Sequence, residues 1–84
     1  MESQASYELF FKELGARLKT LRRKAGFSQE DMLTYGFSTR HWQQIEAGRP
    51  ITMTTLLRVC DVFQSPPEKI LKGLYKPQKI SDRV

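Results

Sequence analysis

Residues Thr39 to Gln44 carry side chains that can hydrogen-bond to the edges of base pairs. An Arg side chain can make two hydrogen bonds to guanine, a Gln side chain can pair with N6 and N7 of adenine, and Thr can contact the thymine methyl group. Thr39, Arg40, Gln43 and Gln44 offer this chemistry within six positions that hold no acidic residue. Gln is also common on exposed helix surfaces, so residue types alone do not establish such a contact.

The sequence contains few residues that could bind a metal, form a disulfide or carry out catalysis. With 84 residues we expect one domain. A single Cys60 and a single His41 exclude a two-thiolate zinc site, an internal disulfide and a CxxC redox pair. No cluster of acids supplies an acid–base pair, so we expect no enzyme, no metal and no cofactor. No apolar run approaches membrane-spanning length and the first residues lack the basic start of a signal peptide, which predicts a cytoplasmic protein with no membrane partner.

Positive charge is concentrated in one segment. The net charge is +5, and five basic residues without an intervening acid lie within eight positions: Arg17, Lys19, Arg22, Arg23 and Lys24. Such a cluster favours a polyanionic partner, but a solvated helix face explains it equally well.

The spacing of apolar residues predicts five helices and an all-α fold. Residues 7–25 carry Phe10, Phe11, Leu14, Leu18 and Leu21 on one face, with Ser6 as cap and Gly26 at the end. A short second helix follows Ser28, whose hydroxyl and the Asp31 carboxylate form the pattern of a capping box, and it stops near Gly36. A third helix starts at Ser38, buries Trp42 and Ile45, and ends at Ala47 and Gly48.

The sequence predicts the boundaries of the last two helices less clearly. Residues 51–54 alternate like a strand, but without a partner strand we expect a loop and a fourth helix, capped by Thr52 or Thr54, that carries Leu56, Leu57, Cys60 and Phe63. Ser65, Pro66 and Glu68 predict the start of a fifth helix, which carries Ile70, Leu71 and Leu74. We therefore divide the chain into a flexible N-terminus (1–6), one domain (7–75) and a polar tail (76–84), frayed or docked on a partner chain.

Two short helices joined by a glycine-containing turn are what a helix-turn-helix requires, and here the sequence is similar to a known family. Residues 18–30 and 38–48 resemble the Xre and phage lambda-repressor-like helix-turn-helix family, and residues 55–63 match its usual continuation. The most diagnostic parts are Arg-x-x-x-Gly-x-Ser-Gln from Arg22 and Ile-Glu-x-Gly from Ile45. The resemblance covers residues 14–74 and implies a compact five-helix DNA-binding domain.

The resemblance also implies roles for individual residues. Arg22 would form a buried ion pair with Glu46. Gln29 and Ser38 would contact phosphates, and Arg49 would contact the backbone or a minor groove. The candidates for facing bases are Thr39, Arg40, His41, Gln43 and Gln44. A phosphate contact from Arg40 is nearly as well supported, His41 is more often solvated or phosphate-facing, and Gln29 is also an ordinary helix-start residue.

One departure from the family pattern affects the turn. The segment from Met32 to Gly36 is one residue shorter than is common, with Leu33 where Ala is usual. A shortened second helix would shift the third, so the sequence does not decide which of its residues enters a groove. Trp42 would fill the space that the deletion leaves.

These observations predict a dimeric repressor or autoregulator that reads a palindromic operator in double-stranded DNA, with the third helix in the major groove. We expect no small-molecule ligand. The proposed dimer surface consists of Ile70, Leu74, Tyr75 and Ile80. The alternative function is an adaptor or antitoxin-like module that keeps this fold and binds polymerase or a toxin. Glu30 and Asp31 near the turn are candidates for a contact with polymerase in an activator.

Overall fold

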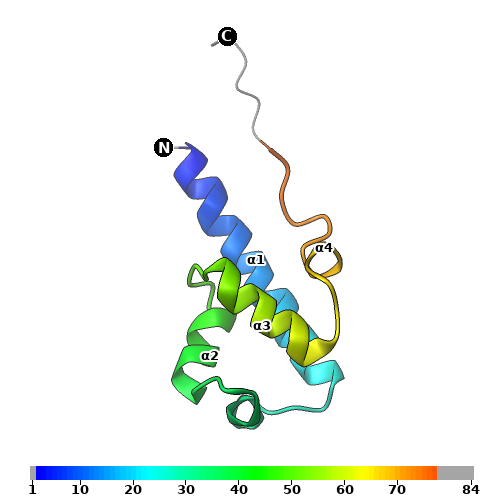
Figure 1. Cartoon of the computed structure of the whole chain (residues 1–84). Helices are drawn as coiled ribbons and strands as arrows, with labels where there is room; N and C mark the ends of the chain where they lie inside the picture. Colours follow the sequence, from blue (N-terminus) through cyan, green and yellow to red (C-terminus); the bar gives the residue numbers. More distant parts are fainter. Residues whose placement is uncertain (1, 78–84) are drawn as a thin grey trace.

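The part of the chain that the structure describes contains helices joined by short loops, and no strand. The computed structural model describes the backbone of residues 2–77 and the side chains of residues 7–77. Five helical segments follow in order: α1 (Glu2–Lys24), the 3₁₀ helix η1 (Glu30–Tyr35), α2 (Thr39–Glu46), α3 (Met53–Phe63) and α4 (Pro67–Ile70). Figure 1 shows η1 at the bottom, α2 at the lower left and α4 on the right. The predicted all-α, five-helix fold is confirmed.

Helix α1 is longer than the sequence predicted. It begins at Glu2 instead of after a cap at Ser6, so the backbone of residues 2–6 continues the helix. Because no Pro or Gly lies between Glu2 and Ser6, nothing in the sequence stops the helix there. Its end is where we expected it, since the N–H of Phe27 donates to the carbonyl of Arg22 (3.0 Å) just beyond Gly26.

The core contains side chains from all five helices. Its buried apolar residues are Leu14, Leu18, Met32, Phe37, Trp42, Ile45, Leu56, Val59, Cys60 and Ile70. Trp42 is fully buried, as predicted. Burial raises the pKa of the Cys60 thiol, which fits a packing residue. Leu56, Val59 and Cys60 form the buried face of α3, whereas Leu57 is 47% exposed.

Gly15 lets α1 and α2 approach closely. A Cβ atom at this position would lie 2.6 Å from the carbonyl oxygen of Ile45 and 2.7 Å from that of Glu46. Both are backbone atoms, which cannot move aside as a flexible side chain would. The end of α2 therefore rests directly on the backbone of α1, and only a residue without a side chain fits at the crossing.

Helix α4 starts one residue later than predicted, and Ser65 does not cap it. Pro66 is the N-cap residue with an extended ψ of 158°, and Pro67 is the first helical residue. The ring of Pro67 disfavours the helical conformation in the residue before it, so Pro66 stays outside. The helix ends at Ile70, which leaves Leu71 and Leu74 beyond its end. Arg17 ties this end to α1, because its Nη1 donates to the carbonyls of Ile70 (2.9 Å) and Lys72 (2.6 Å).

The proposed dimer surface is corrected in part by this packing. Ile70 is 2% exposed and belongs to the core, so its side chain is not available to a partner. Leu74 is half-buried and Tyr75 is exposed. Ile80, and most of the predicted tail, lie outside the described residues. No helix within residues 2–77 is long and apolar enough to cross a membrane.

Candidate nucleic-acid interface

Local hydrogen bonds define the start of η1 and the turn between η1 and α2. Before η1, the Ser28 hydroxyl accepts from the N–H of Asp31 (3.1 Å) and the N–H of Ser28 donates to the Asp31 carboxylate (2.7 Å). This is the expected capping box. Gly36 ends η1 with a φ of 88°, which a side chain would disfavour. The Ser38 hydroxyl then caps α2 by accepting from the N–H of His41 (3.0 Å).

The second helix, which overlaps the segment that is one residue short, is a 3₁₀ helix. A 3₁₀ helix rises about 2.0 Å per residue, whereas an α-helix rises about 1.5 Å per residue. The six residues of η1 therefore span a length close to that of eight α-helical residues. The 3₁₀ form therefore makes this segment longer than six α-helical residues would be.

Arg58 on α3 contacts the turn between η1 and α2, a role that sequence reasoning missed. Its Nη2 donates to the carbonyl of Gly36 (2.8 Å), and its guanidinium carbon lies 4.3 Å from the centre of the Phe37 ring. A cation over an aromatic face is attracted by the ring's negative face. No local pattern could have identified this contact, because the two partners lie 22 residues apart.

Helix α2 separates an inner face from an outer one. Trp42 and Ile45 are buried. The base-facing candidates all remain at least partly accessible: Arg40 and Gln43 are exposed, and Thr39, His41 and Gln44 are half-buried. Arg40, Gln43, Gln44 and Ala47 line one depression on the surface. We call Thr39, Arg40, Gln43 and Gln44 the outer face of α2. The His41 ring instead lies against the Phe37 ring, with 5.8 Å between their centres.

The ion pair between Arg22 and Glu46 is present and buried. Arg22 donates from Nε to Glu46 Oε2 (2.6 Å) and from Nη2 to Glu46 Oε1 (3.1 Å). The two side chains are 8% and 5% exposed. Arg22 also donates from Nη1 to the carbonyl of Phe27 (2.9 Å), and Trp42 Nε1 donates to Glu46 Oε2. The pair therefore joins the end of α1 to the end of α2.

The Glu46 carboxylate is held in its ionised form. Burial opposes its charge, but hydrogen bonds from Arg22, Gln29 and Trp42 outweigh burial and lower its pKa below the usual 4.5. The hydrogen bonding of Arg22 to Glu46 outweighs burial and raises the pKa of Arg22. Both charges therefore persist at neutral pH, each stabilised by the other.

Gln29 is placed differently from a simple phosphate ligand. Its Nε2 donates to Glu46 Oε1 (3.0 Å), and its Oε1 accepts from Nε2 of Gln43 (3.2 Å). Its side-chain amide therefore links the buried ion pair to the outer face of α2. One N–H of the amide remains after these two contacts, so a phosphate contact stays a prediction for Gln29.

The other phosphate candidates lie at the two ends of α2. Ser38, before the helix, is exposed, and its hydroxyl can still donate while it accepts the capping bond. Arg49, after the helix, is exposed. Together with the outer face of α2, these residues place hydrogen-bond donors along one side of the helix and at both of its ends.

The basic cluster of α1 has two parts. Arg17 and Arg22 make contacts within the protein. Arg17 donates to backbone carbonyls at the end of α4, and Arg22 donates to Glu46. Lys19, Arg23 and Lys24 are exposed. Two of the five charges therefore serve the fold, and three remain for solvent or a polyanion.

Comparison with known proteins identifies the class of domain to which this arrangement belongs. A family model described as a helix-turn-helix domain matches residues 13–71, which is more than half of the chain. The protein belongs to the helix-turn-helix domain family. This agrees with the resemblance to the Xre and lambda-repressor-like family, and it supports DNA as a partner. No curated protein and no solved structure matches the chain.

Proposed function

We propose that this protein is a sequence-specific regulator of transcription that binds double-stranded DNA as a homodimer, with α2 in the major groove. The observation that carries the proposal is the outer face of α2. Arg40, Gln43 and Gln44 project from a helix that buries only Trp42 and Ile45, and an exposed helix with Arg and amide side chains suits base edges in that groove. We infer that it acts as a repressor or autoregulator.

The experiment is selection of binding sites from random DNA duplexes, followed by affinity measurements on the selected site and on a shuffled one. A variant with Arg40→Ala and Gln44→Ala is expected to lose about one to two orders of magnitude in affinity for the selected site. Its affinity for shuffled DNA should fall much less, because phosphate contacts carry nonspecific binding. The wild-type affinities should decrease steeply as salt is raised.

Lys69→Ala is the matched control, because Lys69 is an exposed cation on α4. It removes one positive charge without touching α2, and it should leave the preference for the selected site intact. Equal affinity of the wild-type protein for selected and shuffled DNA would contradict the proposal. So would a preference that survives in the Arg40 and Gln44 variant.

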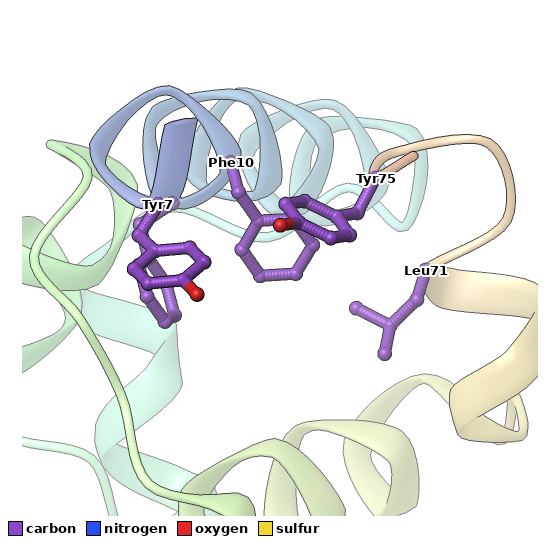
Figure 2. A pocket seen from close by; sticks show the side chains of 5 residues that line it. Tyr7, Phe10, Leu71 and Tyr75 are labelled. Carbon is purple, nitrogen blue, oxygen red and sulfur yellow. The ribbon is translucent and has the colours of Figure 1, made fainter. Parts of the chain in front are cut away.

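For the dimer surface we propose a groove at the N-terminal half of α1 in place of the buried Ile70. Tyr7, Phe10, Phe11, Leu71 and Tyr75 line this groove, which we call the aromatic groove. Figure 2 shows the Tyr7, Phe10 and Tyr75 rings beside one another, with Leu71 facing them. The Phe10 and Tyr75 rings meet edge to face with 5.8 Å between their centres. Tyr7 is 54% and Tyr75 39% exposed.

Charge favours a second copy of this chain as the occupant of the aromatic groove. Each copy carries +5 overall, but residues 7–16 of α1 contain one lysine and two glutamates, whereas residues 17–24 contain five basic residues and no acid. Two copies that meet at the groove therefore keep their most basic segments apart. No residue of α2 lines the groove, so both outer faces stay available for two half-sites, roughly 34 Å apart.

Sedimentation of the free protein tests the dimer surface. A variant with Tyr7→Glu and Tyr75→Glu is expected to be monomeric, because the dimer would have to bury the new carboxylates in apolar surroundings. Tyr35→Glu, at a 41% exposed position on η1, is the matched control and should remain dimeric. A dimer that withstands the paired substitution would refute this surface, and a monomeric wild-type protein would refute the dimer itself.

A further inference from the structure

Arg17 on α1 attaches the start of the segment that follows α4, which we call the 71–75 segment. Nη1 of Arg17 donates to the carbonyl oxygens of Ile70 (2.9 Å) and Lys72 (2.6 Å). These carbonyls lie immediately before and after Leu71, so one guanidinium nitrogen holds the backbone on both sides of this residue. Both lie at the C-terminal end of α4 or just beyond it, where carbonyl groups lack partners within the helix.

Ring contacts attach the other end of the 71–75 segment. The Tyr75 ring lies 5.8 Å from the Phe10 ring and 6.2 Å from the Tyr7 ring, measured between ring centres (Figure 2). The contacts of the segment move back along α1 as the chain moves forward. The segment therefore runs antiparallel to α1 and contacts it near both of its ends.

These two attachments determine the width of the aromatic groove. The residues that line the groove come from the two attached elements: Tyr7, Phe10 and Phe11 from α1, and Leu71 and Tyr75 from the 71–75 segment. Apolar contacts between the two walls have no preferred direction, whereas a hydrogen bond requires a narrow range of distances and angles. The hydrogen bonds of Arg17 therefore set where the second wall stands relative to α1.

Arg17 acts on the groove without being part of its surface. It is half-buried and does not line the groove, so a second copy seated there does not touch it. Its side chain also differs from that of Lys19, the next cation of the basic cluster, which is exposed. An effect of Arg17 on the dimer must therefore pass through the 71–75 segment.

We propose that Arg17 is a positioning residue for the dimer, which holds Leu71 and Tyr75 at the distance from α1 at which the aromatic groove accepts a second copy of this chain. This inference rests on the proposed function, because it concerns the groove to which we assign the dimer surface. Without Arg17, the 71–75 segment is held to α1 by apolar contacts alone. The groove then takes several widths, and the apparent affinity of the dimer falls with the fraction that has the right one.

The first test examines the groove itself and needs no dimer. In NMR spectra of dilute wild-type protein, nuclear Overhauser contacts are expected between the ring protons of Phe10 and Tyr75, because these rings meet edge to face. Arg17→Ala should weaken these contacts severalfold. Lys19→Ala removes an exposed cation from the same helix and should leave them unchanged. Ring contacts of full strength in Arg17→Ala would overturn the proposal.

The second test measures the dimer by sedimentation over a range of protein concentrations. Arg17→Ala is expected to raise the dissociation constant of the dimer by about tenfold or more, since two carbonyls lose a charged donor. Lys19→Ala should change it by no more than about twofold. Arg17→Lys keeps the charge but lacks the planar guanidinium, so its dissociation constant should lie between those of the wild type and Arg17→Ala. Circular dichroism shows which variants remain folded.

A double variant separates positioning from a general loss of stability. Arg17→Ala combined with Tyr75→Ala should weaken the dimer little more than Tyr75→Ala alone, because Arg17 acts through the wall that carries Tyr75. Losses that add in full would give Arg17 a role independent of the groove and overturn the inference. So would an unchanged dissociation constant in folded Arg17→Ala and Arg17→Lys proteins. A monomeric wild-type protein would refute the proposed dimer, whereas the ring contacts would still decide whether Arg17 holds the groove.

Discussion

Replacing Glu46 with Ala is expected to lower the free energy of unfolding by about 3–5 kcal/mol, because it leaves the Arg22 guanidinium buried without its partner. The guanidinium would keep only its bond to the Phe27 carbonyl. The indole N–H of Trp42 and the amide of Gln29 would also lose their acceptor. A domain of this size is stable by roughly 5–15 kcal/mol, so urea denaturation followed by circular dichroism should reveal the loss clearly.

Two further variants separate this prediction from a general effect of mutation. Glu13→Ala removes an exposed acid on α1 and should change stability by no more than about 0.5 kcal/mol. The paired replacement Arg22→Met with Glu46→Leu removes both charges together and should recover much of the loss, because no unpaired charge is left. A Glu46→Ala protein as stable as Glu13→Ala would contradict the role given to the ion pair.

The ion pair also predicts an acid limit to stability. The folded-state pKa of Glu46 is lowered from 4.5, so the folded protein binds this proton less readily than the unfolded chain. The stabilisation is complete above pH 4.5 and is lost as the pH falls through the lowered folded-state value. Glu46→Gln cannot titrate at this position, so its free energy of unfolding should decrease less over the same acid range.

Features fixed by neighbours in the sequence were predicted well. The caps at Ser28 and Ser38, and the cap at Thr52 that was one of two alternatives, depend on side chains within three residues of the N–H groups they accept from. The burial of Leu14 and Leu18 on α1 follows from their spacing alone. The wrong start of α4 also has a local cause. Pro67 disfavours a helical conformation at Pro66, but the prediction relied on Ser65 as a cap and did not take this effect into account.

Features that depend on how helices cross were not predictable from local patterns. The need for glycine at position 15 becomes visible only when α2 is packed against α1, because a side chain there would clash with the end of α2. Arg17 and Arg58 looked like ordinary surface cations, yet each donates to a backbone carbonyl more than 20 residues away. The ion pair of Arg22 and Glu46 was expected from the family resemblance, but the link through Gln29 to Gln43 appeared only with the arrangement of three segments.

The second large effect is expected at Trp42. Trp42→Ala should lower the free energy of unfolding by about 3–5 kcal/mol, because it removes a fully buried ring and leaves a cavity. The ring packs edge to face on Phe37 at 5.1 Å between centres and lies 6.4 Å from the Phe63 ring. Helix α2 has only eight residues and two buried side chains, so Trp42 carries much of its attachment to the core.

Trp42→Phe distinguishes the ring from its N–H group. It keeps an aromatic ring for Phe37 and Phe63 but removes the donor to Glu46, which retains Arg22 and Gln29. We expect a loss of about 1–2 kcal/mol, measured by circular dichroism because the chain has one Trp. A helix as short as α2 is not stable alone. If Trp42 anchors it, Trp42→Ala should therefore abolish preference for the selected DNA site at temperatures where α1 and α3 remain helical, and a retained preference would contradict that role.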